Sequence, residues 1–218
     1  MSLMRKAAMF AGLAALVVLT GCGGNAREKM AKEYERLAAL PPAAPNHCPY
    51  DRALDRLGVA VSENYNFAHK LMKDFVGATE NRRAYVGFLN DVAYYVEEEK
   101  MEETAAMERV VKEIQAADEK IADPKEKVWP RVVEGINATN ALNPVQKLQE
   151  LAPVAAATLR AIAECEQLKN SFNGFDATTI EKGICAGKII VQGKEASECI
   201  AFLTIQLQRT IKAKCYAK

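Results

Sequence analysis

The chain has 218 residues with 29 Lys and Arg against 28 Asp and Glu, and its formal net charge at pH 7 is +1. This near-neutral balance, without a cluster of Lys and Arg, argues against nucleic acid or a purely electrostatic membrane surface as the partner. Hydrophobic residues make up 50% of the chain, so it can bury a core. Its length allows one sizeable domain or two small ones, of which we expect one.

The start of the chain has the three-part layout of an export signal. Arg5 and Lys6 are followed by an uncharged apolar run over residues 7–19, and small residues then precede a cysteine. As a helix this run covers about 20 Å, whereas the hydrocarbon core of a bilayer is about 30 Å thick. The segment therefore predicts a removable signal peptide over residues 1–21 rather than a permanent transmembrane anchor.

The end of this signal carries the residues Leu19, Thr20, Gly21 and Cys22. They fill every position of the signal-peptidase box of bacterial lipoproteins, and the start of the chain resembles that class. The resemblance implies a diacylglycerol on the Cys22 sulfur, cleavage before it, and acylation, such as with palmitate, of the new amino terminus. Two acyl chains give stable membrane anchoring. Because Gly23 rather than Asp follows, the resemblance implies a periplasm-facing anchor, in the outer membrane rather than the inner one. The alternative is an ordinary secretory signal with a chance cysteine.

Residues 22–47 are expected to form the lipidated N-terminus, a short helix and a Pro-rich tether. Met30, Tyr34 and Leu37 recur at helical spacing within residues 26–40. Prolines between residues 41 and 45 then end that helix, because proline lacks an amide donor and restricts the residue before it. Residues 48–218 are expected to form the main helical domain.

Apolar residues recur at three- and four-residue steps over several long windows, which predicts amphipathic helices. The windows are 51–76, 80–122, 144–172, 178–193 and 195–216. We expect a single helix over 80–122, although the acidic residues 97–103 offer a place for a break. Pro153 predicts a kink or a fresh start. With short pieces between the windows, the predicted fold class is an all-α, multi-helix bundle of about five to seven helices. A β-hairpin from residues 188–192 and 204–207 is the less favoured alternative.

Five cysteines remain when Cys22 is set aside, and in an oxidising periplasm they are candidates for disulfide bonds. Because five is odd, at least one thiol stays free or pairs between molecules. If residues 178–193 and 195–216 form a helical hairpin around Gly193, the axial offset of Cys185 and Cys199 is only about 3 Å, which favours that pair. Cys165 competes for Cys185, while Cys48 and Cys215 stay unassigned. We expect one or two disulfides to staple the bundle.

The chain shows no catalytic or metal-binding pattern. His47 and His69 are its two histidines, and neither has the Glu three residues earlier that a di-iron bundle requires. A Cys-x-x-Cys-His haem motif, a Gly-x-Ser-x-Gly motif and a Gly-rich phosphate loop are also missing from the sequence. The glutamates of residues 97–103 are expected to be a solvated face rather than a cation site. We expect no enzymatic activity, no metal and no cofactor.

Four aromatic residues lie within one helical window: Tyr85, Phe88, Tyr94 and Tyr95. We expect them to pack in the core, with a surface groove for a partner helix as the alternative. The sequence thus favours a lipid-anchored periplasmic protein with a binding, scaffold or accessory role beside an envelope protein. The alternative is a carrier of a lipid or haem-like apolar ligand in the bundle core. An interior cavity lined by Leu, Met and Phe favours the carrier, and an exposed apolar surface favours the partner.

Overall fold

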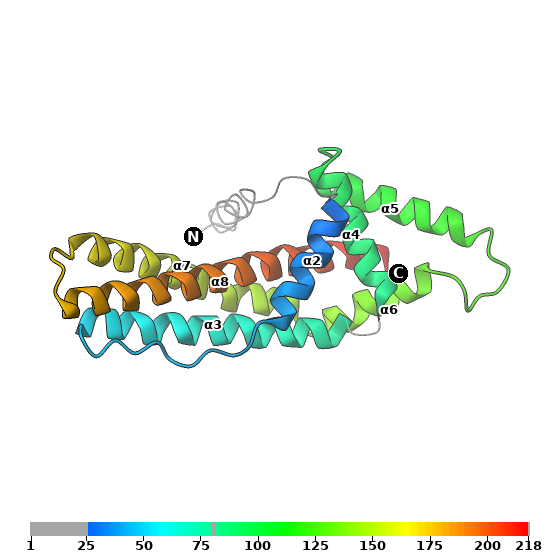
Figure 1. Ribbon diagram of the computed structural model, residues 1–218. Helices are drawn as coiled ribbons and strands as arrows, with labels where there is room; N and C mark the ends of the chain where they lie inside the picture. Colours follow the sequence, from blue (N-terminus) through cyan, green and yellow to red (C-terminus); the bar gives the residue numbers. More distant parts are fainter. Residues whose placement is uncertain (1–25, 80–81, 218) are drawn as a thin grey trace, which may run out of the picture. The chain divides into compact units, whose positions relative to one another are not determined.

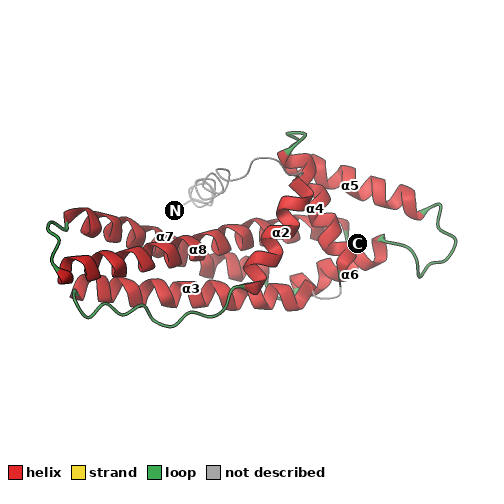
Figure 2. Cartoon of the chain, in the orientation of Figure 1, coloured by secondary structure: helices red, strands yellow, loops and turns green. Residues whose placement is uncertain are grey.

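A computed structural model describes residues 26–79 and 82–217 of the chain. These residues form seven α-helices and no strand, and Figure 1 and Figure 2 show how the chain is arranged. They are α2 (Ala26–Ala39), α3 (Arg52–Thr79), α4 (Arg83–Glu97), α5 (Glu103–Asp118), α6 (Trp129–Asn140), α7 (Pro144–Ser171) and α8 (Ala177–Ala213), followed by the short 3-10 helix η1 (Lys214–Tyr216). The all-α, multi-helix prediction is confirmed, and the alternative β-hairpin is wrong.

The predicted signal peptide and Cys22 lie outside the described residues. The lipid anchor therefore stays a prediction. Among the helices that are described, none is long and apolar enough to cross a membrane.

The chain divides into two compact units, each with its own core. Unit 1 contains Leu40–Met72 and Gln149–Leu203. The described part of unit 2 contains residues 26–39, Lys73–Leu148 and 204–217. The helices α3, α7 and α8 contribute residues to both units, so the division does not fall in linkers. The single domain expected over residues 48–218 stays a prediction.

The core of unit 1 is built from α3, α7 and α8. Its buried residues include Leu54 and Val61 from α3, Ala161 from α7, and Ile189 from α8. Leu54 and Val61 are apolar positions that recur at helical spacing in the sequence, so burial of one face accounts for α3.

Gly193 lies inside α8 rather than in a turn, so the helical hairpin expected there is wrong. A Cβ at this position would lie 2.6 Å from the Cγ1 atom of Ile162 on α7. Glycine in a helix costs about 1 kcal/mol relative to alanine, and here it allows α7 and α8 to pack closely. Sequence patterns cannot separate a packing glycine from a turn glycine.

Continuity of α8 also removes the geometry that favoured a Cys185–Cys199 disulfide. The two cysteines are 14 residues apart on one helix, which corresponds to about 21 Å along its axis. Disulfide bonding requires Cα atoms within about 7 Å. No disulfide joins the cysteines of the described chain, and the predicted staple is not seen.

The core of unit 2 is centred on α4. Its Tyr85 and Phe88 are buried, the Tyr85 hydroxyl lies 2.7 Å from the Thr210 hydroxyl, and the Phe88 ring packs edge-on against Trp129 at 6.3 Å. Burial raises the pKa of Tyr85. A Cβ at Gly135 of α6 would lie 2.3 Å from the Tyr85 Cβ, so glycine is needed for α6 to approach α4.

The single helix expected over residues 80–122 is wrong, because α4 ends at Glu97 and α5 begins at Glu103. Lys100, between them, has a left-handed backbone with φ of 56°. The Glu102 carboxylate accepts hydrogen bonds from the amides of Thr104 and Ala105 and so caps α5. A carboxylate stabilises a helix start, whereas a run of neighbouring glutamates inside a helix repels itself. The acidic stretch is therefore a helix boundary.

Aspartate carboxylates cap the starts of several other helices. Asp51 accepts bonds from the first amides of α3, Asp118 from Val128 and Trp129 at the start of α6, and Asp176 from Thr179 at the start of α8. Pro153 lies within a continuous α7, so the fresh start predicted there is wrong.

Candidate functional site

The Pro-rich segment Leu40–Cys48, which we call the strap, is bonded along α3 within unit 1. Its prolines prevent regular structure, so its backbone polar groups need other partners. Polar α3 side chains supply them. Three side chains donate to strap carbonyl oxygens: His69 Nε2 to Leu40 O, Tyr65 Oη to Pro41 O (2.8 Å) and Asn66 Nδ2 to Ala43 O (2.9 Å).

Three α3 side-chain oxygens accept hydrogen bonds from strap amides. These are Asn66 Oδ1 from Ala43 N (2.9 Å), Ser62 Oγ from Asn46 N (3.0 Å) and Asp55 Oδ1 from Cys48 N (3.0 Å).

Gly58 allows the strap to lie directly on α3. A Cβ at position 58 would be only 1.9 Å from the backbone oxygen of Asn46. The Asn46 side chain also donates to Gln192 of α8 at 2.7 Å, and Ser62 Oγ bonds the same Gln192 oxygen at 2.9 Å. The strap is therefore held by α3 and α8 together.

Three thiols meet in unit 1 where the strap ends. Cys48 is 1% exposed and lies 2.7 Å from Cys185 of α8. Cys165 of α7 is buried in the same core, and its thiol contacts Ala186 O at 3.5 Å. Burial, with the neighbouring Cys48, raises the pKa of Cys165 to about 11 and that of Cys185 to about 12.

Both histidines have structural contacts. His47 is 66% exposed and its Nδ1 lies 3.1 Å from Asp55 Oδ1. The amide of Cys48 and the His47 side chain lower the pKa of Asp55. His69 is buried, stacks on Tyr65 at 6.1 Å and donates to the strap. Among the described residues, no group of three or more His, Cys, Asp or Glu is placed to hold a metal ion.

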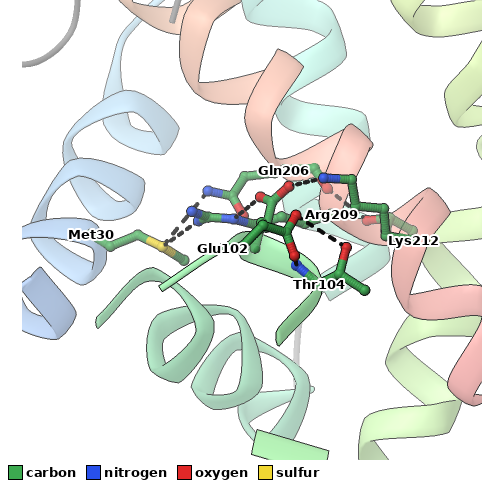
Figure 3. Close-up of polar contacts among 8 residues, drawn as sticks. Met30, Glu102, Thr104, Gln206, Arg209 and Lys212 are labelled. Atoms are coloured by element: carbon green, nitrogen blue, oxygen red, sulfur yellow. Dashed lines mark hydrogen bonds and ion pairs between the residues drawn. The ribbon is translucent and has the colours of Figure 1, made fainter. Parts of the chain in front are cut away.

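Unit 2 contains a largely buried charge cluster at the C-terminal end of α8. Figure 3 shows Arg209 and Gln206 reaching the Met30 thioether of α2, with Sδ at 3.6 Å from Arg209 Nη1 and 3.7 Å from Gln206 Nε2. Arg209, whose side chain is 5% exposed, pairs with Glu103 at 3.0 Å, and Lys212 pairs with the other Glu103 oxygen. The cluster fixes α2 and the start of α5 against α8.

The solvated face expected at residues 97–103 is therefore wrong for Glu103. Its side chain is 20% exposed and faces two cations. Glu99 is more exposed and pairs with Arg109 at 2.7 Å. A sequence shows the charges but not their partners, because Arg209 is more than a hundred residues away.

A row of aliphatic side chains on α8 of unit 1 is exposed. Ile180 is 52% exposed, Ile184 47% and Val191 58%. With Gly187 they recur at steps of four, three and four residues, so all four lie on one helix face. We call these four residues the α8 stripe. Apart from the adjacent residues and the nearby backbone of α8 itself, no described atom lies within 4 Å of a Cβ built on Gly183 or Gly187, so space is open there. Phe175, just before α8, is 97% exposed.

An open groove of about 570 Å³ lies elsewhere on unit 1, between α3 and α7. Its apolar floor consists of Ala53, Leu57 and Leu168, which are half-buried, whereas Arg56, Glu164, Gln167 and Ser171 are exposed around it. This lining differs from the interior cavity of Leu, Met and Phe that would favour the carrier alternative.

The aromatic residues of α4 pack in the core, as expected. Tyr85, Phe88 and Tyr95 are buried, and Tyr94 is half-buried and packs edge-on against Tyr95 at 5.4 Å. They do not form the alternative surface groove. An exposed apolar surface is found instead in the α8 stripe, which was not among the sequence predictions.

No family model, curated protein or solved structure matches the chain.

Proposed function

We propose that this chain is a lipid-anchored binding or scaffold protein of the bacterial cell envelope, and that a helix of a partner protein docks on the α8 stripe. The observation that carries this proposal is the exposure of Ile180, Ile184 and Val191 on one helix face. Single exposed aliphatic residues are ordinary, but an aligned row is typical of an interaction surface.

Burial of the α8 stripe by a partner would contribute favourable free energy to docking. Full burial of an Ile or Val side chain contributes about 1.5–3 kcal/mol relative to exposure. Each stripe side chain already has part of its surface covered, so the three together offer roughly 2–4 kcal/mol of apolar burial to a partner. This is enough to direct docking when the anchor raises the local concentration of both proteins.

A helix fits the stripe better than a loop or a flat sheet face. Gly183 and Gly187 lack side chains and face open space, so a second backbone can approach closely there. The row of aliphatic groups has the helical spacing that complements the apolar face of another amphipathic helix. The proposed partner is therefore an envelope protein that presents such a helix.

The proposed lipid on Cys22 would hold unit 2 close to the membrane. Only residues 23–25 separate Cys22 from α2, a reach of at most about 14 Å. Tyr34 of α2 bonds Thr79 at 2.6 Å and Leu37 is fully buried, so α2 is part of unit 2. Residues 23–25 are therefore the whole connection between the proposed lipid and unit 2. The proposal includes the outer membrane as the location and no catalytic role.

Crosslinking of intact envelopes, extraction of the native protein in mild detergent and mass spectrometry test this proposal. We expect a defined protein to copurify with the wild type, to be lost with Ile184→Lys, and to be reduced with Cys22→Ser. Val145→Lys is the matched control, because Val145 is also an aliphatic residue of similar exposure (53%) but belongs to unit 2, whereas the stripe belongs to unit 1. Equal recovery with both Lys variants, or a stoichiometric small molecule without a protein, would contradict the proposal.

A further inference from the structure

We propose that Cys48 and Cys185 form a disulfide bond that fastens the strap to α8, while Cys165 stays a buried thiol. This inference concerns unit 1 alone and does not depend on the partner proposal. It rests on the contact between Cys48 and Cys185 and on the hydrogen bonds that hold the strap in place.

The approach of the two thiols is imposed by the surrounding structure. Asp55 accepts the Cys48 amide at 3.0 Å, and Asn46, two residues earlier, is bonded to Ser62 and Gln192. These bonds fix the strap against α3 and α8 immediately before Cys48. The 2.7 Å contact exceeds the S–S bond of about 2.05 Å by less than about 1 Å, so a small shift is enough for the bond to form.

The other cysteines are less suitable partners. The Cys165 thiol is fully buried and directed to Ala186 O. Cys199 lies further along α8, where its thiol contacts Ala68 O at 3.6 Å. Cys215 is exposed in η1 and belongs to unit 2. Cys185 is only partly buried, so it is the thiol of the contacting pair that an oxidant can reach.

The reaction is an exchange with an external disulfide, such as oxidised glutathione or a disulfide oxidoreductase. Cys185 loses its proton to solvent, attacks one sulfur of the oxidant and releases the other as a thiol. Cys48 then loses its proton and attacks the Cys185 sulfur of the mixed disulfide, which releases the second thiol. Two protein thiols become one disulfide, and the oxidant's disulfide becomes two thiols. The raised pKa of Cys185 makes the first step faster at alkaline pH.

Peptide mapping tests the pairing directly, because trypsin places each described cysteine in a different peptide. Cys48 lies in residues 37–52, Cys165 in 161–169, Cys185 in 183–188, Cys199 in 195–209 and Cys215 in 215–218. The purified full chain is equilibrated with oxidised glutathione, blocked with an alkylating reagent and digested without reduction. We expect peptide 37–52 linked to peptide 183–188, and its loss after reduction.

Three serine variants make the test specific. Cys165→Ser should keep the linked peptide, whereas Cys48→Ser and Cys185→Ser should lose it and leave the remaining partner open to alkylation. Far-UV circular dichroism of each reduced variant checks that it is folded. Links through peptides 161–169, 195–209 or 215–218, or full alkylation of Cys48 and Cys185 in the oxidised wild type, would overturn the proposal.

Discussion

Substitution of Gly58 by alanine tests whether the strap is held on α3 as the structure indicates. The new Cβ would lie 1.9 Å from the backbone oxygen of Asn46. An unstrained carbon–oxygen contact is about 3.3 Å, so the strap must move by more than about 1 Å. That displacement breaks the bonds of Asn46 to Ser62 and Gln192, which are 3.0 and 2.7 Å long.

The magnitude follows from these two bonds. Losing a buried hydrogen bond costs about 1–3 kcal/mol when a partner is left unsatisfied. Alanine in place of glycine inside a helix returns about 1 kcal/mol. Loss of both bonds, less this gain, should lower the free energy of unfolding of Gly58→Ala by about 1–5 kcal/mol. Gly183→Ala is the matched control in the same unit, because its Cβ meets no atom within 4 Å, and we expect it to stabilise by about 0.5–1 kcal/mol.

Urea denaturation followed by circular dichroism measures the global effect, and the alkylation rate of Cys48 measures the local one. Cys48 is buried at the end of the strap, so its alkylation requires the strap to open. We expect faster alkylation in Gly58→Ala and an unchanged rate in Gly183→Ala. If both variants were equally stable and equally protected, the close approach of the strap to α3 would be refuted.

Three further predictions concern the unit cores and the charges. In unit 2, Gly135→Ala drives a Cβ to 2.3 Å from the Tyr85 Cβ and should destabilise by about 1–3 kcal/mol in urea denaturation, whereas Gly87→Ala, with open space around it, should not. Glu103→Gln leaves buried Arg209 without its counter-charge and should cost about 3 kcal/mol. Glu99→Gln, at an exposed pair, should cost less than about 1 kcal/mol in the same assay. The Cys48 amide and His47 lower the pKa of Asp55 below its unfolded value. The stability that the ionised Asp55 carboxylate contributes is therefore complete above the unfolded pKa of about 3.9, and it is lost as the pH falls through the folded pKa. Asp55→Asn should therefore flatten the decline of the urea midpoint below about pH 4, and an unchanged decline would contradict this assignment.

The helices α3 and α4 were predictable because each buries a regular apolar face. Leu54 and Val61 in α3, and Phe88 and Val92 in α4, follow the spacing that the sequence analysis used. The boundaries were less predictable. The break at Glu102 depends on a carboxylate capping a helix, and the continuity of α8 at Gly193 depends on close packing against Ile162. Both depend on three-dimensional neighbours that local propensity does not contain.

The strap contacts and the α8 stripe could not be predicted from the sequence, because they also depend on three-dimensional neighbours. The strap is held by polar α3 side chains such as Tyr65 and Asn66, and nothing in a linear pattern assigns them to a Pro-rich segment. In α8, apolar residues occupy more than one face, so periodicity could not show that Ile189 is buried while Ile184 is exposed. The four-, three- and four-residue spacing of the stripe was the available signal.

A photo-reactive amino acid at position 184 of the full chain, irradiated in intact cells, tests the central claim most directly. The account predicts one defined protein adduct at position 184, none with the same probe at position 145, and loss of the adduct when Cys22→Ser removes the anchor. No adduct at position 184, or the same adducts at both positions, would contradict docking of a partner helix on the α8 stripe.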